Sequence, residues 1–480
     1  MKRQLLPSWK VLCFLGTAFW ATSCTKMLNE TAEGGTRVPV TNAPLALDEP
    51  ELVELFREDF DQNNINKQND NFWRTRKGRS YAWGKTIAMN ADENVSVDES
   101  ILSLKYTMQK GTNDTLFYIG GGIISNASFG YGRYEAKVKL YTGSYGYHQS
   151  FWMSNDIQDL NGFEFDSRLT GFSYLYPSCY NHLKNPDEKF EFIPSTGDGY
   201  KALSGGATKQ DPGFINTYNQ PTNTSNTPWH TFVYDWKPGS ITMYLDNEYF
   251  GKINPTGTNG TNFDALYSPS PVYLSGIPFK FYPQTNLVPP SEGARMQVGY
   301  FSYSARKHLN VNILGDPAFK NAIFNSAENG YLSSMWRKSR ITGYDVSDKG
   351  YTNNVIQVNG QNYLQHKGTG SYQANSYQTL QYIRNGTYKL SADIMCSDHS
   401  ADGLQLIAID ITNQKVLASY SVQYAHSTLV TITAKGKDAN GNPTDTFSVT
   451  NNNVRVLIRS NVISGGGSVQ VASVKLVAVN

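Results

Sequence analysis

Short runs of alternating apolar and polar residues dominate the chain from about Glu51 onward. In the segment 133–140 every second position is apolar, and charged residues lie between: the apolar positions are Tyr134, Ala136, Val138 and Leu140. Successive side chains of a β-strand point to opposite faces, so this alternation predicts a strand with one buried face. Asn, Gly, Asp and Ser turns separate such runs, and no long helical periodicity competes with them. The pattern predicts an all-β fold of the sandwich class.

The alternation is interrupted near Arg306-Lys307-His308 and then resumes toward the C-terminus. There, an Asn385-Gly386-Thr387 turn leads into an alternating strand over residues 388–394. Each part is long enough to bury a core of its own. We therefore predict two β domains, residues 51–306 and residues 307–480.

The N-terminus has a different pattern. Met1-Lys2-Arg3 is followed by an apolar run, Val11–Ala21, that is too short to span a bilayer permanently. It predicts a signal peptide over residues 1–23. The end of this run, Ala21-Thr22-Ser23-Cys24, resembles a bacterial lipoprotein cleavage site, which implies a lipid on Cys24, although most such sites have leucine in place of Ala21. A plain secretory signal peptide is the alternative.

Residues 24–50 are polar and contain Gly34-Gly35, so they are predicted to form a flexible tether. No other stretch is apolar for long enough to cross a membrane. The expectation is an exported outer-membrane lipoprotein, facing the periplasm or the cell surface and held by its N-terminal lipid.

Composition narrows the classes of partner. The formal net charge is only +2, which does not favour nucleic-acid binding. The aromatic fraction is 13%, with 31 Tyr and 8 Trp, and flat rings with polar edges suit stacking on sugars. Cys179 and Cys396 lie in different predicted domains, so a disulfide between them is not favoured. No Cys/His spacing indicates a zinc site.

Four stretches of the first predicted domain have a distinctive order and spacing. They are Glu93–Val97 with Ile101–Leu104, Gly122–Ser125 with Phe129–Leu140 and Ser150–Met153, Glu164-Phe165-Asp166, and Trp229–Pro238 with Tyr244–Asp246. Together they resemble glycoside hydrolase family 16, the group of laminarinases, agarases, carrageenases and lichenases. The resemblance implies a concanavalin-like jelly roll of two curved sheets with a glycan cleft on the concave face. The expected activity is endo-acting, retaining hydrolysis of a β-linked polysaccharide.

The second predicted domain also has recognisable features. They are Asn312–Phe319, Trp336, Tyr377–Leu380 and Asn385–Tyr388. In combination they resemble the carbohydrate-binding jelly rolls often appended to such enzymes. A structural spacer domain remains an alternative.

The family resemblance gives roles to individual carboxylates. The family motif is Glu-x-Asp-x-Glu, or Glu-x-Asp-x-x-Glu where a β-bulge adds a residue. By resemblance Glu164 is the nucleophile and Asp166 the residue that sets its charge, and the last glutamate of the motif is the proton donor. Alternate residues of a strand share a face, which brings such groups together. In this chain the last position is Arg168 without a bulge or Leu169 with one, and neither is a carboxylic acid.

Three explanations for the missing proton donor stay open. Another cleft group could supply the proton, and the candidates are His148, Asp156, Asp159 and His182. The domain could instead bind glycans without turnover. The site could also be rebuilt for an anionic glycan, because the planar fork of Arg168 matches a uronate or sulfate. A weaker fourth idea is a polysaccharide lyase in which Arg168 neutralises a uronate.

The same resemblance suggests further substrate-binding positions. Besides Arg168 and His182, they are Trp83, Trp152 and His148, the last where relatives often have a sugar-stacking Trp. Trp73 is a further candidate. Core packing is the favoured interpretation for Trp73 and Trp152 and an equal alternative for Trp83. Gly120-Gly121-Gly122 is interpreted as a turn before a strand. No cofactor or metal site is predicted, since no ligand cluster for the calcium ion found in some relatives can be assigned.

Overall fold

The structure is a computed structural model of the full chain. It describes residues 52–62, 65, 72–76, 80–141, 147–157, 160–170, 174–181, 188–194, 226–262, 267–278, 290, 293–320, 336–338, 351–369, 372–397, 403–422, 425–462 and 467–479. The predicted signal peptide, Cys24 and the predicted tether lie outside these residues. Pro50–Asn480 form one compact unit. The described residues contain no helix that is long and apolar enough to cross a membrane.

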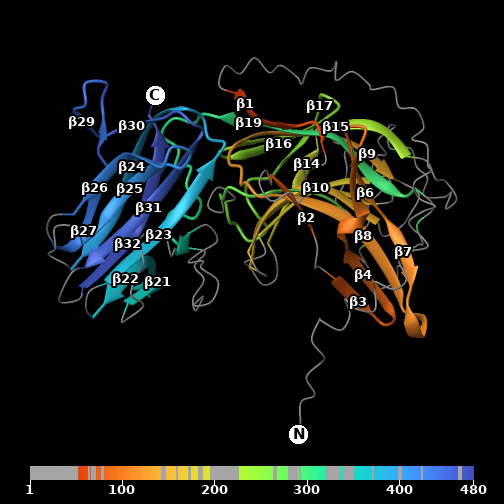
Figure 1. The fold of residues 1–480 in the computed structure, drawn as a ribbon, viewed down its shortest axis with the longest axis horizontal. Coiled ribbons are helices and arrows are strands. Elements are labelled where there is room, and N and C mark those ends of the chain that lie inside the picture. The colour runs from red at the N-terminus through yellow and green to blue at the C-terminus, as the bar shows by residue number, and fades with distance from the viewer. Residues whose placement is uncertain are drawn as a thin grey trace, which may run out of the picture. The chain divides into compact units, whose positions relative to one another are not determined.

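The first part of the chain folds into two packed sheets (Figure 1). Among the described residues, one sheet has nine strands, with β1 (Leu52–Glu58) pairing β19 beside the main path. The main path runs β14 (Phe192–Pro194), β17 (Glu248–Ile253), β16 (Ser240–Leu245), β15 (Asn226–Lys237), β9 (Gly132–Tyr141), β19 (Arg295–Arg306), β6 (Ile101–Lys105) and β5 (Val95–Asp98).

The facing sheet has ten strands within the described ranges. Its path runs β13 (Glu188–Phe190), β12 (Tyr174–Asn181), β11 (Leu160–Thr170), β10 (Tyr147–Ile157), β18 (Val272–Pro278), β8 (Leu116–Ser125), β4 (Thr86–Asn90) and β3 (Ser80–Trp83), while β2 (Trp73–Thr75) and β7 (Thr107–Lys110) also pair β8. Two short 3-10 turns, η2 (Asp92–Asn94) and η3 (Thr112–Asp114), flank this region.

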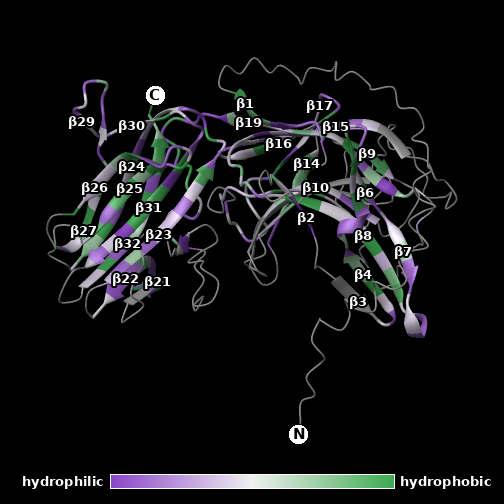
Figure 2. Cartoon of the chain, in the orientation of Figure 1, coloured by the Kyte–Doolittle hydropathy of each residue, from purple (hydrophilic) through white to green (hydrophobic). Residues whose placement is uncertain are grey.

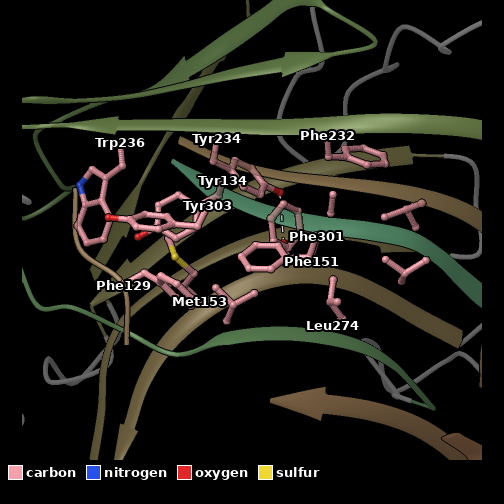
Figure 3. Close-up of a cluster of buried hydrophobic side chains, with 14 of the residues drawn as sticks. Phe129, Tyr134, Phe151, Met153, Phe232, Tyr234, Trp236, Leu274, Phe301 and Tyr303 are labelled. Atoms are coloured by element: carbon pink, nitrogen blue, oxygen red, sulfur yellow. Dashed lines mark hydrogen bonds between the residues drawn. The ribbon is translucent and has the colours of Figure 1, made fainter. Parts of the chain in front are cut away.

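The alternation seen in the sequence builds the core between these sheets. The predicted inward positions of β9 are almost fully buried, and they are Tyr134, Ala136, Val138 and Leu140. Figure 3 shows aromatic rings from both sheets meeting between the layers, among them Phe151, Tyr234 and Phe301. The Tyr234 hydroxyl donates to the carbonyl oxygen of Phe151 at 3.2 Å, so its polar end is satisfied inside the core.

The other face of β9 is buried at Arg133 and Glu135, although both side chains are charged. Glu135 is 3% exposed; it accepts a hydrogen bond from the Tyr300 hydroxyl and lies 3.5 Å from Arg133 Nη2. A second buried pair joins the two strands that flank β9: Arg306 Nη2 of β19 donates to Asp235 Oδ1 of β15 at 2.7 Å. Buried charges persist when they are paired in this way.

The glycine triplet 120–122 lies inside β8, so its interpretation as a turn was wrong. A Cβ on Gly120 would sit 2.2 Å from the Gly276 carbonyl oxygen, and one on Gly121 would sit 2.4 Å from the Asn94 carbonyl oxygen. These contacts are closer than any real Cβ tolerates. The glycines are therefore required by close backbone approach within a strand rather than by a turn.

The C-terminal part forms a second sandwich with its own hydrophobic core, which contains Trp336, Leu390 and Val456. Its first sheet runs β20 (Arg337–Lys338), β23 (Tyr372–Gln381), β31 (Asn453–Val462), β25 (Gln405–Asp410) and β26 (Lys415–Ser421). Its second runs β21 (Tyr351–Val358), β22 (Gln361–Gly368), β32 (Gly467–Ala478), β24 (Gly386–Cys396) and β27 (His426–Thr433), with β30 (Phe447–Val449) pairing β24. A separate two-stranded ribbon of β28 (Gly436–Lys437) and β29 (Pro443–Thr444) also belongs to this C-terminal part.

Hydrophobic and hydrophilic residues alternate along the strands of this sandwich, as Figure 2 shows. Cys179 and Cys396 are both buried. The prediction of an all-β chain, with a jelly-roll sandwich followed by more β-structure, is confirmed.

A buried histidine lies inside the second sandwich. His366 is 1% exposed, and its Nδ1 and Nε2 lie 2.7 Å from Ser460 Oγ and 2.8 Å from Ser376 Oγ. Ser376 donates its own hydroxyl proton to Asn353 Oδ1, so it accepts from His366 Nε2–H, and Ser460 donates to Nδ1. This network suits a neutral imidazole, and burial lowers the pKa of His366 to about 3.

Candidate functional site

The predicted catalytic positions lie on β11, near one edge of the ten-stranded sheet. In the pairing with β10, Glu164 is opposite Ser154, Asp166 is opposite Trp152, and Arg168 is opposite Ser150. Residues directly opposite in an antiparallel pair lie on the same face. These positions therefore belong to the face of the sheet that is turned away from the core. We call this face, which carries Trp152 and Tyr273, the site face.

The register of β11 decides between the two alignments of the motif. Its pairing with β10 and with β12 runs without a shift from Glu164 to Leu169. A register shift occurs in β10 instead, between Ser154 and Asp156. Without a bulge in β11, the third alternating position after Glu164 and Asp166 is Arg168. Leu169 falls on the opposite face.

Several predicted residues can be placed only by their strand position. The backbones of Glu164, Asp166 and Arg168 are described, as is that of Trp83 at the end of β3 opposite Thr86. Asp156 is in β10, opposite Asn161. His182 and Asp159 lie outside the described residues. The roles assigned to all of these residues stay predictions.

The β10 residues on the site face are described in full. His148, Ser150, Trp152 and Ser154 alternate along the strand, and each is at most 6% exposed. The residues between them, such as Phe151 and Met153, belong to the core between the sheets. His148 pairs with Ile277 of β18 and is two residues away from Ser150, the partner of Arg168.

An aromatic pair forms the centre of the site face. The rings of Trp152 and Tyr273 stack with centroids 4.1 Å apart and an interplanar angle of 24°. Ile124 of β8 packs with them, and this cluster is separate from the main core. Trp152 Nε1 donates to Ser275 Oγ at 3.0 Å, which holds the indole in one orientation.

Arg76, directly after β2, lies over this pair. Its guanidinium carbon is 4.9 Å from the Trp152 ring centroid and 5.8 Å from that of Tyr273. Its Nη1 donates to Ser275 Oγ at 3.3 Å, and the side chain is 6% exposed. The backbone N–H of Arg76 donates to the Gly122 carbonyl oxygen at 2.7 Å, and a Cβ on Gly122 would lie 3.3 Å from Arg76 Cβ. The glycine therefore gives Arg76 the room to approach the sheet.

The side chains described on the site face are neutral or cationic, whereas the backbone positions of Glu164 and Asp166 add two carboxylates to the same face. The described set combines Arg76, the neutral hydroxyls of Ser150 and Ser275, and His148 with two aromatic rings. Ser150 Oγ is buried and has no hydrogen-bond partner among the described residues. A planar guanidinium beside hydroxyl groups is suited to hold a carboxylate or sulfate.

Sequence reasoning missed Arg76, Tyr273 and Ser275. Strand pairing over long sequence distances brings them beside Trp152, as in the register of Trp152 with Tyr273. Arg76 follows Trp73, and this proximity to a candidate aromatic was the available signal. Trp73 itself is fully buried in the core beside Phe301, so it does not line the site face.

Comparison with known families identifies part of this region. Residues 83–173 match the family model "Glycosyl hydrolases family 16". The matched segment runs from the end of β3 to three residues beyond β11 and so includes Trp152, Glu164, Asp166 and Arg168. A search of curated proteins gives no significant match.

Solved structures similar to the chain include several β-glucan hydrolases. A family 16 endo-glucanase from Bacteroides ovatus has 18% identity and a TM-score of 0.37, covering 52% of this chain and 99% of its own. The laminarinase catalytic domain from Thermotoga maritima has 14% identity and a TM-score of 0.37, covering 54% of this chain and 100% of its own. A β-glucanase from Bacillus licheniformis has 18% identity and a TM-score of 0.33, covering 52% of this chain and 98% of its own.

These TM-scores are below 0.5, so the family relationship rests on the sequence match. That match includes β8, β10 and β11 of the site face, whereas Arg76 and β18 lie outside it, and the resemblance predicted from the sequence is confirmed over the matched residues. The first sandwich of this chain carries the signature of glycosyl hydrolases family 16 in residues 83–173.

Proposed function

We propose that the first sandwich binds an anionic polysaccharide on its site face and does not hydrolyse ordinary neutral β-glucans at an enzymatic rate. The observation that carries this proposal is the unbroken register of β11, in which Arg168 occupies the third alternating position after Glu164 and Asp166. A guanidinium stays protonated at any working pH and cannot act as a general acid. General acid assistance is typically worth about 10²–10⁴-fold in rate.

The described neighbours support an anionic ligand. Arg76 brings a second guanidinium to the same face, and its contact with Trp152 and Ser275 holds it in place. Arg76 and Trp152 are each at most 6% exposed, so Arg76 would act on a glycan at this part of the face mainly through its positive charge. Uronate and sulfate groups pair with such forks through charge-assisted hydrogen bonds.

Hydrolysis is the second candidate, favoured by a specific observation. Glu164 and Asp166 keep the first two positions of the family motif on one continuous strand. A proton donor would then have to come from elsewhere on the face. His148 lies six residues along β10 from Ser154, the partner of Glu164, which is about 20 Å on an extended strand, so the position of His148 does not favour it as the donor. A retaining hydrolase needs the donor about 5 Å from the nucleophile.

A polysaccharide screen with two readouts separates these functions. The mature chain is mixed with neutral β-glucans and with polygalacturonate, alginate and a sulfated galactan, and both gel retention and products are measured. The proposal expects retention by an anionic polymer without products. New reducing ends that vanish in Glu164→Gln would establish the hydrolase, and unsaturated uronates would establish a lyase.

We further propose that the chain is exported and anchored through a lipid on Cys24, as the sequence predicts. Metabolic labelling with a radioactive fatty acid, followed by fractionation, tests this. The wild-type chain is expected to carry label in the outer-membrane fraction, and Cys24→Ser is expected to lose the label. Unlabelled, freely secreted wild-type protein would favour the plain secretory signal.

A further inference from the structure

The second sandwich has a polar outer face on the sheet that contains β23, β31 and β25. The inward residues of these strands, such as Leu380, Val456 and Leu406, belong to its core. The alternate positions form cross-strand rows on the other face. One row is Asn375, Arg459, Gln405 and Ser421; the next is Arg337, Tyr377, Leu457, Ile407 and Ser419; the third is Thr379, Arg455 and Ile409. We call these rows the arginine face.

Arg455 is oriented for binding by its neighbours. Its guanidinium carbon lies 4.8 Å from the ring centroid of Tyr377, and its Nε donates to Thr379 Oγ1 at 3.0 Å. Both Arg455 and Tyr377 are half-buried. The terminal nitrogens of Arg455 have no hydrogen-bond partner among the described residues. A stacked guanidinium held at Nε keeps its terminal pair directed outward for a bidentate acceptor.

The neighbouring row contains a second guanidinium and an unused donor. Arg459 Nε donates to Asn375 Oδ1 at 3.3 Å, which identifies that atom as oxygen because a guanidinium cannot accept. Asn375 Nδ2 is therefore a donor; it is buried and has no hydrogen-bond partner in the described part of the chain. An acceptor supplied by a ligand would relieve the cost of leaving it unpaired.

The centre of the face is apolar. Leu457 lies between Arg455 and Arg459 on β31 and is fully buried, and Ile407 beside it on β25 is 6% exposed. The apolar stems of the two arginines flank Leu457 along the strand. Tyr377 is opposite Leu457, so the tyrosine ring, the apolar side chains and the arginines form one cluster on this face.

The charge of this face has one sign. The three rows contain three arginines, and none of their described positions is an aspartate or glutamate. Arg455 and Arg459 are four residues apart on β31, a separation of about 13 Å along an extended strand. Such a spacing suits repeated anionic groups along a chain better than a single small anion.

We propose that the arginine face is a second binding site, for an anionic polysaccharide that carries uronate or sulfate groups. Arg455 pairs with an anionic group, Arg459 adds positive charge four residues along β31, and Tyr377 contacts the apolar face of a sugar ring. This site is separate from the site face of the first sandwich. Its occupancy does not depend on whether the first sandwich binds or hydrolyses a glycan.

Affinity electrophoresis of the full mature chain in gels that contain polygalacturonate or a sulfated galactan tests this proposal. All variants carry Arg168→Ala, so that the contribution of the site face is reduced equally in each. Arg455→Ala is expected to weaken the remaining binding about tenfold, as for the loss of a charge-assisted hydrogen-bonding group. Arg455→Lys, which keeps the charge but not the fork, is expected to fall between Arg455→Ala and the parent.

Lys475→Ala is the matched control, because Lys475 is an exposed cation on β32 in the opposite sheet. Each variant is checked by its unfolding midpoint, so that a loss of binding is scored only in folded protein. Unchanged binding in Arg455→Ala, or an equal loss in Lys475→Ala, would overturn the proposal. A loss of binding in Arg455→Ala but not in Lys475→Ala supports the proposal. This conclusion holds whether or not Arg168→Ala itself weakens binding.

Discussion

The guanidinium of Arg76 lies over the indole of Trp152, 4.9 Å from its centroid, and both side chains hydrogen-bond to the hydroxyl of Ser275. The three residues come from different strands or strand ends, and together they close the centre of the site face. This arrangement makes the aromatic ring part of a cation site. In the proposed function, this cation beside the ring is what favours an anionic glycan over a neutral one.

The first prediction concerns the stability of this contact. Arg76→Ala removes a desolvated cation–π contact and a hydrogen bond, so the free energy of unfolding should fall by about 2 kcal/mol. Arg76→Lys keeps the cation but loses the planar fork, and its loss should be smaller. Urea denaturation of both variants measures this. Equal stability of wild type and Arg76→Ala would show that the contact contributes nothing.

The second prediction concerns the missing acid. Arg168→Glu places carboxylates at all three alternating positions of β11, as in the family motif. If the absent acid is what prevents turnover, release of reducing ends from a neutral β-glucan should rise by about 10²–10⁴-fold. The measurement is a reducing-sugar assay of purified protein.

Arg168→Gln is the control for this gain, because it removes the charge without supplying an acid. It should remain inactive. A folded Arg168→Glu variant that binds β-glucan but releases no products would mean that more than the acid has been lost from the site face.

The third prediction concerns pH and the buried His366. Burial lowers its pKa from 6.5 to about 3, so the folded state stays neutral where the unfolded state takes up a proton. Stability is therefore lost as the pH falls from about 6.5 toward 3, with a slope of about 1.4 kcal/mol per pH unit from this group. His366→Gln should reduce the stability difference between pH 6.5 and pH 5 by roughly 2 kcal/mol.

Urea denaturation at the two pH values tests this prediction. The quantity compared is the change in the free energy of unfolding between the two pH values, so a constant loss of stability in the variant cancels. The pKa of His308 is also lowered, to about 4, through burial and the nearby Arg306 and Lys237. It titrates in the same window and remains in both proteins. Identical pH dependence of wild type and His366→Gln would contradict the neutral network.

The fourth prediction concerns the buried ion pair of Arg306 and Asp235, each at most 8% exposed. Burial lowers the pKa of Arg306 to about 10 and raises that of Asp235, because each charged form is less stable away from water. Asp235→Ala leaves a buried cation without this partner and should cost about 3–5 kcal/mol. Thermal unfolding checks this, and a loss below about 1 kcal/mol would rank the pair with surface salt bridges.

The β-architecture could be predicted because alternation directly encodes which face of a strand is buried, as in Tyr134 to Leu140. The glycine triplet 120–122 was misread because glycine serves turns and close backbone approach alike, and only the positions of Gly276 and Asn94 reveal which applies. The sequence was enough to identify Arg168 as one of two residues that could replace the proton donor. Choosing between Arg168 and Leu169 required the register of β11 with its two neighbouring strands. Tyr273 could not be found, and the only sequence signal for Arg76 was its closeness to Trp73, because the proximity of both residues to Trp152 arises from long-range pairing.

The central claim is that the site face binds an anionic glycan through Arg168 and its neighbours. The most direct test is titration calorimetry of polyuronate oligosaccharides with the mature chain and its Arg168→Ala variant, both carrying Arg455→Ala so that the arginine face contributes equally little. Lys252→Ala, an exposed cation on β17, is the control. The account predicts a dissociation constant at least about tenfold higher for Arg168→Ala and unchanged for Lys252→Ala. Equal affinity with and without Arg168 would contradict it.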